Sequence, residues 1–347
     1  MAKKSWGLPY MGSKNSIAKD IVNALPSGER LVDLFSGGCA ITDYALKNTN
    51  KFSRFLVNDL NGWSPQMYLK ALAGGFKDEE RWISKQDFFR LKDTDPYVKL
   101  CFSFGNNLKY YMYSTELEPY KRALHHIIFW ENYGPMEELC PQVVDIIKEY
   151  CKGKDRKGRR LASGYAVADH IKQKGSVEYW KSNPLFRSVK VKWSEERCGL
   201  KGLELANNAM KDISIKSILQ SLESLERLER LQNIADMTER ASLSPHDMFI
   251  ETSNISYEDY AYRDGDVVYC DPPYKNTHDY GIRFDSDAFW EWARTRSYPV
   301  YVSEYQAPED FVSIWSKEKR SILNSESPTA PRTEHLFVNK MFADATP

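Results

Sequence analysis

The chain of 347 residues lacks several signals that would assign a protein to a familiar class. Its 48 basic and 48 acidic residues cancel, so the net charge indicates no partner. No apolar run reaches the roughly 20 residues that a membrane-spanning helix needs. Residues Met1–Gly7 lead into no apolar core of the length found in signal peptides. We therefore expect a globular protein of the cytoplasm that does not bind a membrane.

Cysteine and histidine occur without the spacing of a metal site. The six cysteines form no Cys-x-x-Cys pair, and the six histidines form neither His-x-Glu nor His-Glu-x-x-His. Disulfides and zinc are therefore not expected, and a reducing compartment fits this use of cysteine. We predict no metal.

Zero net charge hides a basic segment. From Lys148 to Lys201, 15 lysines and arginines stand against 6 acidic residues, a local net charge of +9. Such a run is usually a solvated loop, but beside a site that handles nucleic acid it is typical of phosphate contacts. The candidates for these contacts lie in its densest part and are Lys154, Arg156, Lys157, Arg159 and Arg160.

Both ends of the chain carry an α/β pattern. The first part reads as a helix at Ile17–Leu25, a strand at Leu31–Phe35, a tight turn at Ser36–Cys39, a helix at Ala40–Lys47 and a strand at Phe55–Val57. In doubly wound sheets a glycine turn after the first strand approaches the ligand, and an acid after the second strand binds ribose hydroxyls. Gly37 and Asp59 have this spacing.

A helix predicted at Trp63–Leu72 completes this first part. The pattern returns late in the chain, where we predict strands at Asp266–Cys270, Pro299–Ser303 and Leu336–Val338 and a helix-like segment at Pro308–Ser316. Residues 1–74 and 244–347 would thus form one discontinuous domain, into which residues 75–243 are inserted.

The insert is aromatic and charged. Cys101–Tyr113 is expected to be a hairpin or loop crowded with rings, which either stack on bases or belong to the core. We favour the core for Phe102 and Phe104. The leucine repeat Ser221–Gln232 is expected to be a helix that serves packing alone.

The most informative segment is Asp271-Pro272-Pro273-Tyr274, which follows the apolar run Asp266–Cys270. A carboxylate, backbone carbonyls and an aromatic ring at a strand end can hold a planar amine: the oxygens accept its two N–H bonds and the ring stacks on its face. An ordinary strand-ending turn is the alternative, and the tetrapeptide alone does not separate the two.

Four ordered motifs together resemble one family. Tyr10–Lys14, Asp33–Gly38, Asn58-Asp59 and Asp271–Tyr274 are similar to motifs of the Dam-like, alpha-class (D12 type) DNA adenine-N6 methyltransferases. The resemblance implies a doubly wound, Rossmann-like domain with a large inserted target-recognition domain. It also implies S-adenosyl-L-methionine as methyl donor, S-adenosyl-L-homocysteine as product, and N6 of a flipped adenine in duplex DNA as acceptor.

The resemblance assigns roles to individual residues. Asp271, Pro272, Pro273 and Tyr274 would form the catalytic motif, with Asp271 and the Pro272 carbonyl on the adenine amino group and Tyr274 on its ring. Lys14 would bind the carboxylate of the cofactor and Asp59 its ribose. The full set implied to contact the cofactor is Tyr10, Lys14, Asp33, Phe35, Gly37, Gly38, Asp59, Ser256 and Asp271.

Two positions depart from the family pattern: Cys39 stands where a second glycine is usual, and Ser256 stands where an acid is usual. The resemblance implies a bacterial enzyme, or a phage enzyme acting in the bacterial cytoplasm, with duplex DNA as partner. A cognate restriction endonuclease is a further partner of such enzymes, and a monomer is favoured. The alternatives are an RNA adenine-N6 methyltransferase and a catalytically silent DNA-binding module of the same fold.

Overall fold

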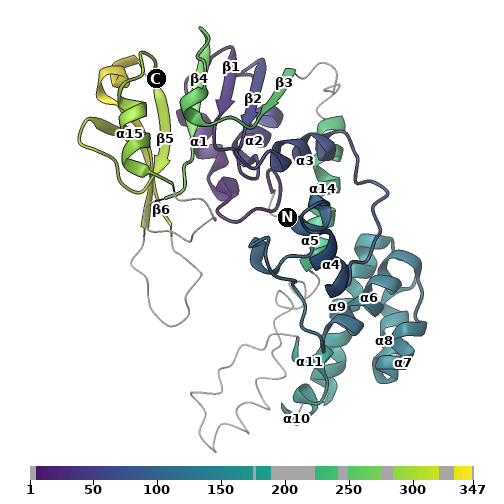
Figure 1. Cartoon of the computed structure of the whole chain (residues 1–347). Helices are drawn as coiled ribbons and strands as arrows, with labels where there is room; N and C mark the ends of the chain where they lie inside the picture. The colour runs from purple at the N-terminus through teal and green to yellow at the C-terminus, as the bar shows by residue number, and fades with distance from the viewer. Residues whose placement is uncertain are drawn as a thin grey trace, which may run out of the picture. The chain divides into compact units, whose positions relative to one another are not determined.

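A computed structural model describes residues 5–174, 177–188, 223–240, 249–274, 284–319 and 332–345 (Figure 1). The chain divides into two compact units. Unit 1 comprises Met1–Lys77 and Arg230–Pro347, and unit 2 comprises Asp78–Glu229. The Asp-Pro-Pro-Tyr segment lies in unit 1, and the basic run Lys152–Arg160 lies in unit 2.

Unit 1 is built on a seven-stranded sheet in the order β3-β2-β1-β4-β5-β7-β6. Neighbouring strands from β3 to β5 are parallel, whereas β7 is antiparallel to both β5 and β6. The strands are β1 (Arg30–Asp33), β2 (Arg54–Asn58), β3 (Phe249–Ser253), β4 (Asp266–Cys270), β5 (Val300–Glu304), β6 (Phe311–Lys319) and β7 (Arg332–Asn339). This α/β sheet agrees with the fold class expected from the sequence.

The central strands are buried on both faces. Every residue of β1, β4 and β5 is buried, which explains why their apolar residues stand next to one another and do not alternate with polar ones. Val32, Val268 and Val300 pack in one cluster with Phe289 and Trp292 of helix α15 (Ser286–Arg294). Because side chains alternate along a strand, Asp33 and Tyr269 point to the opposite face.

The helices of unit 1 begin and end close to the predicted positions. Helix α1 is preceded by the short 3₁₀ helix η1, and α2 follows the glycine turn. The bounds are η1 (Lys14–Ser16), α1 (Ala18–Ala24), α2 (Ala40–Asn48), α3 (Trp63–Leu72), η6 (Tyr257–Asp259) and η7 (Lys340–Ala345).

The predicted helix at Pro308–Ser316 is wrong. From Phe311 onward this segment is strand β6, which pairs antiparallel with β7 and has a register shift between Ser313 and Trp315. Pairing with β7 therefore decided the conformation of a segment whose local pattern was ambiguous. Strand β3 was not predicted either, because it pairs with β2 at the edge of the sheet and has no fully buried residue.

The described part of unit 2 is helical. Its elements are α4 (Lys85–Leu91), α5 (Pro96–Cys101), η2 (Phe104–Asn106), α6 (Glu118–Trp130), α7 (Gly134–Leu139), α8 (Pro141–Cys151), α9 (Arg156–Lys174), α10 (Val177–Lys181) and α11 (Pro184–Arg187). The chain passes from unit 2 back to unit 1 within helix α14 (Glu223–Arg240).

The predictions for the aromatic loop and for the leucine repeat agree with the structure to different extents. Phe102 is buried as predicted, but Phe104 is 62% exposed, so the prediction of a core position for Phe104 is wrong. An isolated antiparallel bridge joins Ser103 to Tyr111 and closes the loop between them. Three leucines of the repeat (Leu225, Leu228 and Leu231) are buried on α14, whereas Ser221 and Leu222 lie outside the described residues.

None of the described helices is long and apolar enough to cross a membrane.

Candidate functional site

The strand order of the sheet reverses between β1 and β4. In open α/β sheets, ligands bind outside the carboxyl ends of the strands at such a reversal. The residues that follow β1, β2 and β4 at this edge are the glycine turn, Asp59 and Asp271. The sheet therefore brings together three motifs that are far apart in the sequence.

The residues after β2 hold the glycine turn. The Asp59 carboxylate accepts a hydrogen bond from the backbone N–H of Gly37 at 2.8 Å and another from the N–H of Asn61 at 2.8 Å. The N–H of Ser36 donates to the carbonyl of Asn58 at 2.9 Å. Burial raises the pKa of the half-buried Asp59, while the two backbone hydrogen bonds lower it. The turn and the acid are thus one local structure.

Tyr10 lies against the two glycines of the turn. A Cβ on Gly37, which has a φ of +46°, would come within 3.2 Å of the Tyr10 ring. A Cβ on Gly38 would come within 2.6 Å of the Tyr10 Cβ and 2.9 Å of the Leu8 carbonyl oxygen. The missing side chains therefore make room for Tyr10 and the N-terminal segment.

Cys39 keeps the conformation that usually selects glycine. Its φ is 60° and its ψ is 28°, in the left-handed region, and it precedes helix α2. The side chain is fully buried, and burial raises the pKa of its thiol. The departure at Cys39 therefore changes the residue but retains the backbone turn, with the strain that a Cβ brings in this region.

Asp33 is a buried acid at the end of β1. One carboxylate oxygen accepts a hydrogen bond from the Thr42 hydroxyl at 2.9 Å, and among the described residues the other oxygen has no hydrogen-bond partner. Burial raises the pKa of Asp33 to about 8. An unsatisfied buried carboxylate oxygen is costly unless a ligand or water completes it, which makes Asp33 a candidate for contact with a ligand.

A compact charged cluster surrounds Asp271. Lys14 Nζ lies 2.8 Å from Asp271 Oδ1 and 3.2 Å from Glu334 Oε1, and it donates to the Tyr274 hydroxyl at 2.5 Å. The Tyr274 hydroxyl donates in turn to Glu334. Burial raises the pKa of Asp271, and the Lys14 charge opposes this rise. Two of the four residues come from the Asp-Pro-Pro-Tyr segment, and Lys14 comes from the N-terminal motif.

Glu334 is a residue of this cluster that sequence reasoning missed. It lies on β7 and is 1% exposed, on the same face as the buried Leu336 and Val338. The sequence signal was an acid in a series of alternate positions that otherwise carries apolar residues. Such an acid is buried and therefore requires a partner. Its partner Lys14 lies near the other end of the chain, so the sequence alone could not name the pair.

Phe35 and Ser256 lie at the same edge with local contacts. The Phe35 ring contacts those of Tyr257, Phe284 and Phe289, with centroid distances between 5.6 and 5.8 Å. Ser256 precedes η6, and its side chain accepts from the N–H of Glu258. Pro272 is buried and Pro273 is half-buried.

This edge of unit 1 fits S-adenosyl-L-methionine. Asp59 offers carboxylate oxygens to hydroxyl groups, and the free Asp33 oxygen offers a further acceptor. Gly37 and Gly38 have no side chains, and the Tyr10 ring lies beside both of them. Lys14, which the family resemblance assigns to the cofactor carboxylate, is held here by Asp271 and Glu334. Within the described ranges, no group of three or more histidine, cysteine, aspartate or glutamate residues could hold a metal ion.

The basic run in unit 2 has two kinds of residue. Lys154 and Lys157 are exposed. The three arginines have partners within unit 2: Arg156 pairs with Glu80 at 2.7 Å and Arg160 with Glu229 at 2.8 Å, while Arg159 pairs with Glu131 at 2.6 Å and donates to the Ile128 carbonyl. Arg159 and Arg160 are buried, so the structure gives them an internal role that the sequence did not indicate.

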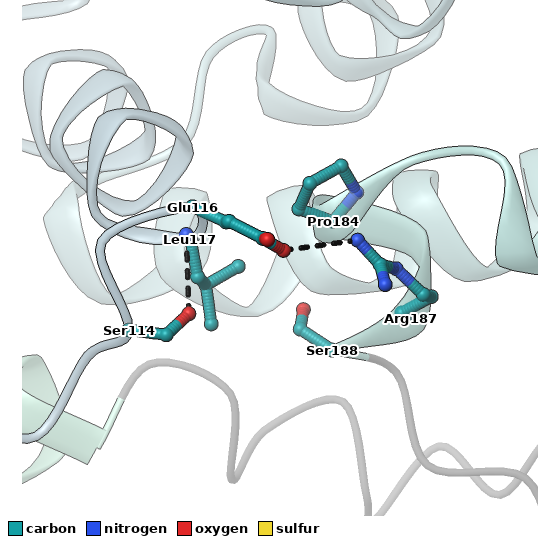
Figure 2. A pocket seen from close by; sticks show the side chains of 6 residues that line it. All are labelled: Ser114, Glu116, Leu117, Pro184, Arg187 and Ser188. Atoms are coloured by element: carbon teal, nitrogen blue, oxygen red, sulfur yellow. Dashed lines mark hydrogen bonds and ion pairs between the residues drawn. The ribbon is translucent and has the colours of Figure 1, made fainter.

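Unit 2 also contains a hollow of about 250 Å³. Glu116 and Arg187 point toward one another across it and form an ion pair at 3.2 Å (Figure 2). Both side chains are exposed, and the remaining lining residues are Ser114, Leu117, Pro184 and Ser188. A solvent-exposed, paired acid and base is typical of a surface ion pair, and we assign no chemistry to this hollow.

Comparisons with known proteins agree with the motif resemblance. A family model for the D12 class N6 adenine-specific DNA methyltransferases matches residues 10–128. This range includes Tyr10, Lys14, Gly37 and Asp59 and ends before Asp271. The retron Ec67 DNA adenine methylase of Escherichia coli is 28% identical over 124 residues, which are 35% of this chain and 37% of that protein. Both findings support the Dam-like D12 family.

Proposed function

We propose that this chain, whose similarity to the D12 class supports DNA adenine methylation, transfers a methyl group from S-adenosyl-L-methionine to N6 of an adenine flipped out of duplex DNA. The observation that carries the proposal is the position of Asp271 and Tyr274 directly after β4, at the reversal of the strand order and beside the strand that leads to the glycine turn.

Asp271 would act on the target amine by accepting hydrogen bonds. The N6 lone pair of adenine is delocalised into the ring, so the amine is a poor nucleophile. Acceptance of its N–H bonds by Asp271 and the Pro272 carbonyl increases the electron density on nitrogen and fixes its direction. When bound, the cofactor supplies an electrophilic methyl group on a sulfonium. The raised pKa of Asp271 also suits this carboxylate to receive the proton that N6 loses after methylation.

The cofactor would lie along the carboxyl ends of β1 and β2. Asp59 would accept the ribose hydroxyls while it holds Gly37, and Tyr10 and Phe35 would supply apolar contacts. The unsatisfied oxygen of Asp33 suits a polar hydrogen on the cofactor. Ser256 would contribute at the end of β3, where its carbonyl and side chain already organise η6.

Unit 2 would recognise DNA. Lys154 and Lys157 are exposed cations suited to phosphates, whereas each of the three neighbouring arginines is paired with an acid of unit 2. Phe104 and Tyr110 are 62% and 64% exposed on one short loop, and exposed rings can stack on unpaired bases. A flipped base leaves its partner unpaired in the duplex, and an exposed ring could stack on this unpaired base.

The test is a transfer assay with labelled cofactor on purified wild-type protein and the variant Asp271→Ala. We expect loss of transfer with an unchanged thermal unfolding midpoint, and Asp264→Ala, at an exposed aspartate before β4, is the matched control. Full transfer by Asp271→Ala would refute the proposed role. Competition between duplex DNA and structured RNA decides the RNA alternative, and cofactor binding without transfer to any DNA would favour the silent binding module.

A further inference from the structure

Lys14 occupies the groups that are proposed to hold the target amine. Its ammonium nitrogen lies 2.8 Å from Asp271 Oδ1 and 4.3 Å from the centroid of the Tyr274 ring. An adenine amino group would need the same carboxylate, and the adenine ring the same aromatic face. The ammonium and the target amine therefore compete for one acceptor, and Asp271 must be shared or released before adenine binds.

Glu334 supplies a second carboxylate at the same ammonium. Glu334 Oε1 is 3.2 Å from Lys14 Nζ and accepts the Tyr274 hydroxyl, and its side chain is 1% exposed. A buried carboxylate held by two donors has a fixed position, because both neighbours restrict its rotamer. Lys14 can therefore leave Asp271 without losing its counter-ion, since Glu334 remains within reach of the same ammonium.

We propose that Glu334 is a positioning residue for methyl transfer: it retains the Lys14 ammonium and the Tyr274 hydroxyl so that Asp271 is free to accept the amine of the target adenine. The inference rests on the proposed function and adds a residue to it. Without the Glu334 charge, Asp271 is the close carboxylate left to Lys14 among the described residues, and the amine must displace the ammonium from the counter-ion that it still has.

The charged surroundings of Asp271 define the expected pH effect. The titratable groups that interact with it come from η1, β1, β4 and its following turn, β5 and β7, and they are Lys14, Asp33, Tyr269, Cys270, Tyr274, Glu304 and Glu334. The negative charge of Glu334 raises the pKa of Asp271. Activity needs the ionised Asp271 and is lost as the pH falls through its pKa. Removal of the Glu334 charge should therefore move the acid limb of the rate profile to lower pH.

The experiment compares wild type, Glu334→Gln and Tyr274→Phe, with Glu318→Gln on the neighbouring strand β6 as the control at an exposed glutamate. We expect kcat to fall about tenfold to a hundredfold in Glu334→Gln, the range for a lost hydrogen bond to a charged group. The acid limb should move to lower pH in this variant only. Tyr274→Phe keeps the ring but removes the hydroxyl group that donates to Glu334, and it should also lower kcat. The double variant should be no slower than the slower single variant, because both changes act on one contact.

A second readout does not depend on methyl transfer. Burial lowers the pKa of Lys14, but the charges of Asp271 and Glu334 outweigh this effect and hold its pKa above the ordinary value. Loss of the Glu334 charge increases the neutral fraction of the amine, so an amine-reactive reagent should label Lys14 faster in Glu334→Gln than in wild type or Glu318→Gln. Mass spectrometry of the peptide that contains Lys14 measures this rate.

The outcomes separate the two proposals. Wild-type protein that transfers no methyl group to any DNA contradicts the proposed function, while the labelling rate still decides whether Glu334 holds Lys14. An unchanged kcat, acid limb and labelling rate in Glu334→Gln would overturn the inference. If Glu334→Gln does not fold, an unchanged kcat in Tyr274→Phe overturns it instead.

Discussion

The Asp59 carboxylate accepts the backbone N–H of Gly37 at 2.8 Å. One side chain thereby links the end of β2 to the glycine turn after β1, and the same carboxylate is proposed to accept ribose hydroxyls. The geometry of the turn and the affinity for the cofactor should consequently depend on a single residue.

Asp59→Ala should weaken cofactor binding about tenfold to a hundredfold, because it removes charged hydrogen bonds to both the turn and the ligand. Isothermal titration calorimetry with S-adenosyl-L-homocysteine measures the dissociation constant. Asp264→Ala, which changes an exposed aspartate outside the site, serves as control. Equal affinities for wild type and Asp59→Ala would exclude Asp59 from the cofactor site.

Asp33 should make the stability of the protein depend on pH. Burial raises its pKa in the folded state to about 8, so the folded state holds a proton that the unfolded chain releases at lower pH. The stabilisation is complete below the unfolded pKa and is lost as the pH rises through about 8. Asp33→Asn, which keeps an acceptor for Thr42, should therefore become progressively more stable relative to wild type from about pH 5 to about pH 8.

Urea unfolding of both proteins across this pH range measures the difference. The ligand-free protein is the sample of choice, since a bound cofactor would add its own pH dependence. A constant difference in the free energy of unfolding between wild type and Asp33→Asn would show that Asp33 titrates normally.

The basic run of unit 2 should separate into binding and structural residues. Lys154→Gln with Lys157→Gln should weaken DNA binding and reduce the slope of log K against log salt by about 2, close to one unit for each phosphate that a lysine no longer neutralises. The unfolding midpoint should stay constant because both side chains are exposed. Fluorescence anisotropy of labelled duplex DNA at several salt concentrations gives the slope.

The matched variant Arg160→Gln should behave in the opposite way. Its buried guanidinium pairs with Glu229 at 2.8 Å, so we expect a loss of about 2 kcal/mol in the free energy of unfolding. An unchanged salt dependence of DNA binding in the double lysine variant would show that Lys154 and Lys157 do not contact phosphates and are only solvated surface residues.

The exposed loop rings should contribute to DNA affinity without contributing to stability. Phe104→Ala and Tyr110→Ala should each weaken binding by about 1–3 kcal/mol if the ring stacks on a base. Phe249→Ala changes an equally exposed ring in unit 1, at 62%, and is the control. Identical DNA affinities for all three variants would mean that the loop does not contact bases.

Several elements could be predicted from the sequence because their signals are local. Apolar runs that are buried on both faces identified β1, β4 and β5, and the spacing of glycine turn, strand and acid identified the neighbourhood of Asp59. These signals depend on neighbours within a few residues, which a sequence displays directly.

The contacts between residues that are distant in sequence were decided by the tertiary structure. Pairing with β7 made a strand of the segment expected as a helix at Pro308–Ser316. Acids of unit 2 pair with Arg159 and Arg160, which were expected to contact phosphate. Glu334 joined Lys14, Asp271 and Tyr274 because β7 inserts antiparallel between β5 and β6. The energy of a buried charge depends on partners that are distant in sequence, so the chain names the ionisable residues and the fold selects their partners.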